Sequence, residues 1–183
     1  MANITTYSQF KGSIYLPNTA PTYAEGTALA LAITKYEHRY LKQFFGYEFY
    51  TLFQAGILAT TQIYEDIRDG STYEDTAGYT QEWEGFMTSE RNPIANYIYF
   101  YHRRDIITST DGIGEQSSAI ENGSRVSPNY KMTQAWNEMV DMNKKLHDFL
   151  VANDDIYPTY QYFTTGGDDE YNQLFTKINA FGI

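Results

Sequence analysis

The sequence predicts a mainly α-helical fold: a bundle of three principal helices plus short helices, with a small β-hairpin insertion and extended terminal arms. Apolar residues recur at intervals of three and four along residues 24–45, 92–108 and 129–152, which is the spacing of one helix face. An Asn-Pro or Ser-Pro pair precedes the second and third stretches, and such pairs are typical of helix starts. The 183 residues are enough to bury one sizeable core.

Three parts are predicted along the chain: an N-terminal arm (1–23), a helical domain (24–153) and a C-terminal aromatic arm (154–183). Pro17 and Pro21 disfavour a helix in the first part, because proline lacks a backbone donor and restricts the residue before it. The last part is rich in Tyr and Phe but has no helical period. We therefore expect an extended arm that closes with a short helix or strand.

The first principal helix is predicted to end at Gly46, because glycine readily adopts the left-handed conformation that follows a helix. A short second helix is predicted over residues 47–55, with Gly56 as its stop. The segment LKQFFGYEFYTLFQAGI is therefore interpreted as two helices joined at a glycine.

The segment over residues 61–90 differs in composition from the rest of the chain. It carries eight acidic residues and a single base, Arg68. Tyr73, Tyr79 and Trp83 favour β structure, and several glycines supply turns. These features predict an acidic insert that forms a hairpin of two short strands or a long ordered loop.

The second principal helix is predicted to begin with Asn92 as its N-cap and Pro93 in its first turn. Residues 108–127 are rich in Gly, Ser and Asn, and we expect a long loop that is functional or ordered by a partner. The third helix is predicted over residues 129–152. The residues expected in the core of the bundle are Ile33, Tyr36, Phe44, Ile98, Trp136 and Leu146.

Charge and composition disfavour several classes of function. The formal net charge of -10 argues against nucleic-acid binding and against an anionic membrane surface. The absence of cysteine excludes disulfides, thiolate metal sites and a cysteine nucleophile. The sequence contains neither an apolar run of membrane-spanning length nor a recognisable signal peptide.

No catalytic, cofactor-binding or metal-ligating residue is predicted. His38, His102 and His147 lie one to a helix, without the close spacing of a metal site. Two stretches, 35–42 and 100–105, combine aromatic and basic residues, but each holds at most three Lys or Arg, too few to bind nucleic acid against the overall charge.

One enzymatic alternative remains open at this point. Glu82 and Glu84 alternate along a predicted strand and would share one face, an arrangement that glycosidase chemistry uses. We therefore keep a carbohydrate-active enzyme as one alternative to a structural role, and a different structural or binding protein, such as a tail or accessory component, as another.

Aromatic residues make up 17% of the chain, and many of them lie in polar stretches. Tyr and Phe bury much area per residue and are favoured at protein interfaces. We therefore expect the two arms to be ordered by contact with neighbouring subunits. The assembly contacts predicted in the arms are Tyr7, Phe10, Tyr15, Tyr157, Tyr160, Tyr162, Phe163, Phe175 and Phe181.

The chain resembles the head–tail connector proteins (adaptor or neck-ring proteins) of tailed bacteriophages. It is most similar to the longer versions found in phages of Bacteroidota, including crAss-like phages. The resemblance lies in residues 35–57, 79–86, 92–104 and 131–150, and includes a first helix that ends in Leu-Lys-Gln-Phe-Phe-Gly before a second short helix. The acidic insert over 61–90 and the aromatic tail depart from the shorter connectors.

The resemblance implies a structural virion protein, not an enzyme, that needs no cofactor. Such a protein is made in the host cytoplasm and forms a homo-oligomeric ring of about twelve copies in the neck. The ring joins the portal to neighbouring neck or tail proteins and lines the channel through which DNA passes during genome ejection. Net acidity suits that passage, because acidic side chains repel phosphate.

Overall fold

The computed structural model describes residues 3–17, 19, 22–87, 92–111, 114–117, 129–160 and 173–179, and for 107–111 and 114–117 it describes the backbone alone. The elements in chain order are η1 (Tyr7–Gln9), η2 (Gly12–Ile14), α1 (Ala24–Leu58), α2 (Gln62–Asp69), β1 (Ser71–Glu74), β2 (Thr80–Trp83), α3 (Pro93–Ile107), β3 (Thr108–Asp111), β4 (Gly114–Ser117) and α4 (Asn129–Ala152). The predicted fold class, mainly α with a β-hairpin insertion, is confirmed.

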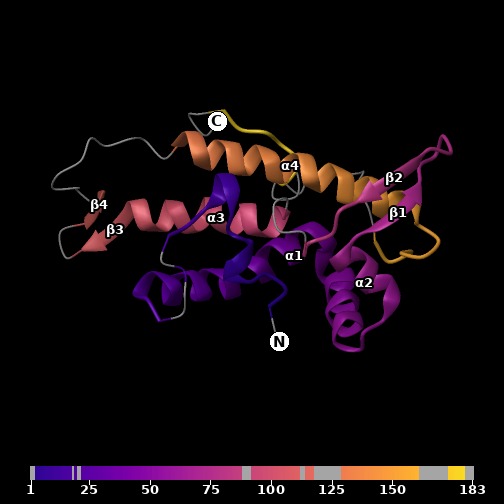
Figure 1. Ribbon diagram of the computed structural model, residues 1–183, viewed down its shortest axis with the longest axis horizontal. Coiled ribbons are helices and arrows are strands. Elements are labelled where there is room, and N and C mark those ends of the chain that lie inside the picture. The colour runs from indigo at the N-terminus through magenta and orange to yellow at the C-terminus, as the bar shows by residue number, and fades with distance from the viewer. Residues whose placement is uncertain are drawn as a thin grey trace.

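The three principal helices pack together as predicted. Helix α3 contacts both α1 and α4, and Figure 1 shows α3 and α4 running side by side along the longest axis. The β1–β2 hairpin and α2 lie at one end of this axis, and β3 and β4 lie at the other. The predicted core is also confirmed, because all six of its residues are buried: Ile33, Tyr36, Phe44, Ile98, Trp136 and Leu146.

The helix boundaries follow from local sequence chemistry. Helix α4 spans Asn129–Ala152, and the predicted range was the same. At the start of α3 the Oδ1 atom of Asn92 accepts hydrogen bonds from the backbone N–H groups of Ile94, at 2.9 Å, and Ala95, at 3.2 Å, as an N-cap does. In the described part of the chain no helix is both long enough and apolar enough to cross a membrane.

Gly46 divides α1 into two helical segments, as its sequence position predicts. Its backbone angles, φ 72° and ψ 165°, lie in a region that is essentially restricted to glycine. The prediction that Gly56 stops the second segment is wrong, because the helix continues to Leu58. A Cβ atom at Gly56 would lie only 1.9 Å from the ring of Tyr64, so this glycine provides space for α2 to pack.

The acidic insert contains one helix that was not predicted. Residues Gln62–Asp69 form α2, whose face with Ile63, Tyr64 and Ile67 packs on the core, and Ile67 is fully buried. The hairpin prediction is confirmed for the rest: β1 and β2 pair antiparallel, with Ser71 opposite Trp83. The indole N–H of Trp83 donates a 2.8 Å hydrogen bond to the carbonyl of Ile67, which ties the hairpin to α2.

The loop predicted over residues 108–127 begins with regular structure instead. Strands β3 and β4 pair antiparallel, with Thr108 opposite Ser117, so the first part of the predicted loop is a second hairpin. This hairpin continues directly from the last turn of α3. The Ser-Pro pair predicted to begin α4 lies outside the described residues.

Aromatic rings from both segments of α1 form the centre of the core. Across the turn at Gly46, the ring of Phe45 lies 5.0 Å from that of Phe49 and 5.1 Å from that of Phe53, measured between centroids. On the other side of the turn, Phe44 lies 5.7 Å from Phe175. Elements distant in sequence therefore meet at one aromatic cluster.

The N-terminal segment packs on its own chain, which corrects the prediction that it is an arm ordered by neighbours. Phe10 and Ile14 are buried in the core with 3% of each exposed, and η1 and η2 shape the backbone around them. The carboxylate of Glu37, itself fully buried, accepts hydrogen bonds from the backbone N–H groups of Ile4, at 2.9 Å, and Thr5, at 2.7 Å. Burial raises the pKa of Glu37, and these two donors oppose that shift.

The C-terminal segment also packs on its own chain in the described residues. Tyr157 is 3% exposed and Tyr160 is 9% exposed, and both rings contact Phe49 of α1. The hydroxyl of Tyr157 donates a 2.8 Å hydrogen bond to the carbonyl of Ile63, and burial raises the pKa of this phenol. Leu174 is 1% exposed. Three aromatic residues of the tail, Tyr157, Tyr160 and Phe175, therefore pack on the core of their own chain.

Replacing Gly46 with Ala is expected to lower the free energy of unfolding by about 1–3 kcal/mol, because a side chain at this φ and ψ strains the backbone. The measurement is chemical denaturation followed by circular dichroism. Glu48→Ala, an exposed site on the same helix, serves as the control and is expected to change stability by less than about 0.5 kcal/mol. Equal stability of the Gly46→Ala and Glu48→Ala variants would show that the turn does not need glycine.

Candidate assembly surfaces

A basic patch forms where the first segment of α1 packs against the end of α3. The rings of Tyr36 and Tyr101 stack with centroids 5.1 Å apart. The guanidinium carbons of Arg39 and Arg104 lie 5.1 Å and 4.5 Å from the centroid of Tyr101, and Lys35 Nζ lies 4.5 Å from the centroid of Tyr36. Cations at these distances are attracted to the ring faces, so the buried tyrosines hold three exposed cations in one place.

Asp105 is the acidic residue within this basic patch. Its Oδ2 atom accepts a short hydrogen bond from the hydroxyl of Tyr36 and lies 3.8 Å from Lys35 Nζ. The pKa of Lys35 is raised, chiefly by its hydrogen bond with Tyr36, and burial together with Asp105 raises the pKa of Tyr36. Both groups therefore stay protonated at neutral pH. Among the described side chains, Lys35 and Arg39 outnumber Asp105 in the basic patch, which gives it a net positive charge.

Sequence reasoning missed the basic patch because its cations come from two stretches, 35–42 and 100–105, each of which is weak alone. The packing of α3 on α1 brings the two stretches together. Lys42 extends the patch one turn along α1, with its Nζ 5.4 Å from the ring centroid of Tyr50. The sequence does carry one signal, the Tyr-rich faces of α1 and α3. These faces predict that the two helices pack together, but they do not predict which cations that packing brings together.

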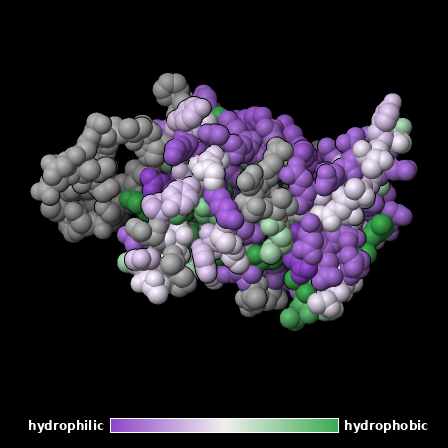
Figure 2. Space-filling view, in the orientation of Figure 1, coloured by the Kyte–Doolittle hydropathy of each residue, from purple (hydrophilic) through white to green (hydrophobic). Residues whose placement is uncertain are grey.

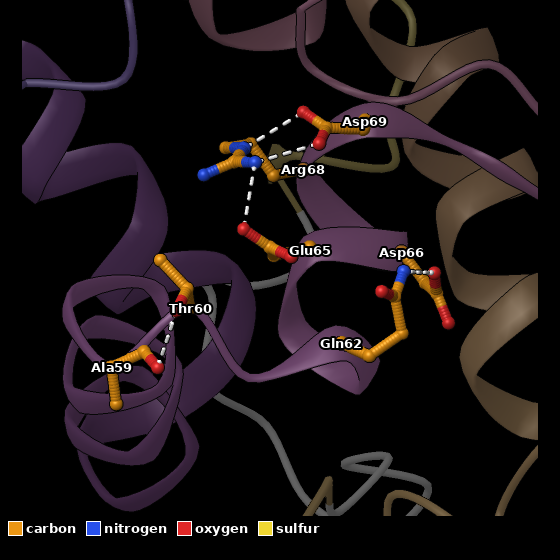
Figure 3. Close-up of polar contacts among 7 residues, drawn as sticks. All are labelled: Ala59, Thr60, Gln62, Glu65, Asp66, Arg68 and Asp69. Atoms are coloured by element: carbon orange, nitrogen blue, oxygen red, sulfur yellow. Dashed lines mark hydrogen bonds and ion pairs between the residues drawn. The ribbon is translucent and has the colours of Figure 1, made fainter.

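The end of the molecule that carries α2 and the β1–β2 hairpin is acidic. The one base of the acidic insert, Arg68, is engaged within α2: its Nη2 lies 2.6 Å from Asp69 Oδ2 and 3.2 Å from Glu65 Oε1 (Figure 3). Hydrogen bonding to Arg68 lowers the pKa of Asp69, so this carboxylate stays ionised. Because Arg68 is held by these carboxylates, the remaining acidic residues of α2 and the hairpin give this end a net negative charge.

An acidic groove lies between the β1–β2 hairpin and the last turns of α4, with a volume of about 640 Å³. Its lining includes Tyr73, Asp75, Glu82, Glu84, Lys145 and Asp148. Lys145 Nζ forms an ion pair with Glu84 Oε1 at 3.0 Å. Asp75, Glu82 and Asp148 therefore give the groove a net negative charge. Figure 2 shows a largely hydrophilic surface over α4 and the hairpin.

Asp75 shapes the turn between the two strands that border the groove. Its Oδ1 atom accepts hydrogen bonds from the backbone N–H groups of Ala77 and Tyr79, both at 2.9 Å. Its Oδ2 atom accepts a 3.0 Å hydrogen bond from the side chain of Gln81. These bonds, the one from Tyr79 above all, lower the pKa of Asp75.

Four of the nine predicted assembly contacts pack on the core of their own chain. Phe10, Tyr157 and Tyr160 are buried in the core of their own chain, and Phe175 is half-buried against it, so these four are not available to neighbours. Tyr7 and Tyr15 are exposed, at 50% and 64%, and assembly contacts there stay a prediction. The other three predicted contacts, Tyr162, Phe163 and Phe181, lie outside the described residues.

The histidines are explained by packing. His38 Nδ1 and the Tyr50 hydroxyl are 2.9 Å apart, and His147 Nδ1 and the Tyr160 hydroxyl are 3.1 Å apart. Burial lowers the pKa of both His102 and His147, so each is neutral in the fold at neutral pH. Among the residues whose side chains are described, no group of three or more His, Asp or Glu is arranged to hold a metal ion.

Comparison of the chain with known protein families, characterised proteins and solved structures finds no match. The proposal of function therefore depends on the two charged surfaces and on the resemblance noted in the sequence.

Asp75→Ala is expected to open the turn between β1 and β2, because three hydrogen bonds to its carboxylate are lost. In the wild type the ionised carboxylate of Asp75 holds the turn closed at pH values above 3.8, the usual pKa of aspartate. The turn is lost as the pH falls through the lower pKa that Asp75 has in the folded state. The measurement is an NMR titration of the Ala77 and Tyr79 amide shifts. Asp154→Ala, at an exposed site, is the control. Unchanged amide shifts in Asp75→Ala would contradict this role.

Proposed function

We propose that the chain is a structural subunit of a phage head–tail connector, and that it forms a homo-oligomeric ring in the virion neck between the portal and the tail proteins. The observation that carries the proposal is the separation of charge along one chain. The basic patch lies on α1 and α3, whereas the acidic groove lies between the β1–β2 hairpin and α4. The resemblance of four segments to connector proteins supports the same assignment.

Opposite charges at different places on one surface favour head-to-tail association. A contact between two different surfaces of identical subunits repeats around a circle and closes a ring when the rotation allows it. Complementary charge accelerates such an encounter and disfavours contacts between like surfaces. In Figure 1 the last turn of α3 leads into β3 at one end, and the hairpin lies at the other end. In the proposed ring, the basic patch of one copy meets the acidic groove of the next.

The proposed ring encloses a channel for DNA. The net charge of -10 disfavours adhesion of the DNA backbone to the ring. Docking of the next subunit would cover the basic patch. Placing the cations at the subunit contact thus leaves the channel wall acidic, which suits passage without binding.

A charge-reversal pair tests the proposed contact. The patch variant carries Arg39→Glu and Arg104→Glu, and the groove variant carries Glu82→Lys and Asp148→Lys. Each variant alone is expected to lose self-association, because two like-charged surfaces meet. An equimolar mixture is expected to recover it, because each reversed surface then meets an opposite one. Sedimentation of the chain, alone and with a phage portal protein, measures the assembly, and high salt is expected to weaken it.

The matched control carries Lys11→Glu and Lys131→Glu, which reverse two exposed bases outside the basic patch. It therefore changes the net charge by the same amount as the patch variant does. It is expected to assemble like the wild type. A mixture of patch and groove variants that fails to assemble, while each variant keeps the wild-type melting temperature, would contradict the contact. A genome with no portal or capsid gene near this one would contradict the virion assignment.

A carbohydrate-active enzyme is the second candidate, and one observation favours it. Glu82 and Glu84 both line the acidic groove, as a pair of catalytic carboxylates would. Lys145 engages Glu84 in an ion pair at 3.0 Å, so this carboxylate is already bound within the chain. The enzyme hypothesis predicts hydrolysis of glycosides by the wild type and a loss of about 100-fold or more in Glu82→Gln. Our proposal predicts that neither protein hydrolyses any of them.

A further inference from the structure

An aromatic ring lies within the acidic groove. Tyr73 on β1 is opposite Gln81 on β2, so the two side chains share one face of the hairpin. The ring of Tyr73 contacts that of Phe149, with centroids 5.4 Å apart, so this face is turned toward α4. Tyr73 is only half-buried, and it lines the groove together with Val151, which is 42% exposed. The groove therefore combines acidic residues with aromatic and aliphatic surface.

The polar groups around Tyr73 are hydrogen-bond acceptors. Asp148 on α4 has no hydrogen-bond or ion-pair partner among the described residues. Gln81 Nε2 donates to Asp75 Oδ2 at 3.0 Å, which leaves the amide oxygen of Gln81 as an acceptor. Burial raises the pKa of Tyr73, and the carboxylates of Asp148 and Asp75 raise it further, so both carboxylates lie near the phenol. The matching donors must therefore come from a ligand or from solvent.

The groove suits a cation larger than a metal ion. Among the described side chains, no group of three or more His, Asp or Glu is arranged to hold a metal. Lys145 is the one base among the described residues that line the groove, and it is already paired with Glu84 at 3.0 Å. The volume of about 640 Å³ lies within the range of about 300–1,000 Å³ that is usual for ligand sites. A ligand whose charge is spread over several donors fits these features.

An arginine side chain has that chemistry. Its guanidinium group is planar, presents five N–H donors and no acceptor, and stacks on aromatic rings. A lysine ammonium is instead a compact and strongly hydrated charge. The chain already pairs arginine with tyrosine in the basic patch, where the guanidinium carbon of Arg39 lies 5.1 Å from the ring centroid of Tyr101. A tyrosine ring beside carboxylates therefore favours arginine over lysine.

Arg39 carries such a group on the basic patch. Its side chain is exposed, and it forms no hydrogen bond or ion pair with a described residue. Lys35, by contrast, donates a 2.8 Å hydrogen bond to the Tyr36 hydroxyl and lies 3.8 Å from Asp105. The donors of Arg39 and the acceptors around Tyr73 are thus complementary, in hydrogen bonding as well as in charge.

We propose that the acidic groove is an arginine-binding site in which Tyr73 determines the preference for arginine, and that its occupant in the assembled oligomer is Arg39 of a second copy. This inference rests on the proposed function, because head-to-tail contact brings the basic patch of one copy to the groove of the next. Asp148 accepts hydrogen bonds from the guanidinium, and the ring of Tyr73 stacks on it. The charge of the groove attracts any cation, whereas the ring selects the planar one.

The patch variant of the full chain, with Arg39→Glu and Arg104→Glu, tests the site without competition from Arg39, because its groove is unchanged. It is titrated with N-acetyl-arginine amide, and with N-acetyl-lysine amide as a control ligand of equal charge. The NMR shifts of the Gln81 and Asp148 amides report binding. Arginine amide is expected to bind about threefold more tightly than lysine amide, or better. Adding Tyr73→Phe is expected to keep this preference, and adding Tyr73→Leu to remove it.

Substitutions of carboxylates in the same background test the acceptors. Asp148→Asn is expected to weaken the binding of arginine amide by about tenfold, because a charged hydrogen-bond partner is lost. Glu74→Gln, at an exposed acid of β1 outside the groove lining, is the matched control and is expected to leave binding unchanged. Equal affinity for the two ligands would overturn the inference, and so would the absence of saturable shifts in the groove.

Sedimentation of the Arg39→Lys variant tests the occupant. This variant keeps the charge of the basic patch but loses the planar group, and its self-association is expected to be about threefold weaker than that of the wild type. Unchanged self-association would overturn Arg39 as the occupant. Ring assembly without a preference for arginine amide rejects only this inference. A preference for arginine amide without ring assembly upholds the arginine site and rejects the head-to-tail contact.

Discussion

The backbone turn at Gly46 is the constraint on which the rest of the structure depends. Its φ of 72° directs the second segment of α1 back toward the first, so that Phe45 contacts both Phe49 and Phe53. The other elements then pack onto these rings: α2 through Tyr64, the segment after β2 through Phe86, and the tail through Tyr157 and Tyr160. The high aromatic content of the chain is therefore explained mainly by its core.

The same turn positions the two charged surfaces. The basic patch lies on the first segment of α1, and α2 with its hairpin follows the second segment, so the angle at Gly46 fixes the direction from one surface to the other. A ring closes only when each subunit contact repeats a constant rotation. In the proposed ring, the aromatic cluster between the two surfaces would hold that rotation, and the hydrogen bonds of Glu37 and Asn143 attach the terminal segments to the same body.

Local chemistry made the helices, the first hairpin and the N-cap Asn92 predictable from sequence, because each depends on neighbouring residues. Helix α2 was missed because its acidic residues obscured the short apolar face of Ile63 and Ile67. The buried positions of Phe10 and Tyr160 were missed because aromatic density does not distinguish a core from an interface. The basic patch depends on which cations meet across α1 and α3, and neither of the two sequence stretches shows this alone.

The central claim is that copies of this chain associate head to tail through surfaces of opposite charge. Electron cryo-microscopy of the assembled chain tests it most directly. The account predicts a closed ring with cyclic symmetry, in which Arg39 and Arg104 of each subunit face the acidic groove of the next. A two-fold dimer in which like surfaces meet, or a ring whose contacts leave the basic patch exposed, would contradict it.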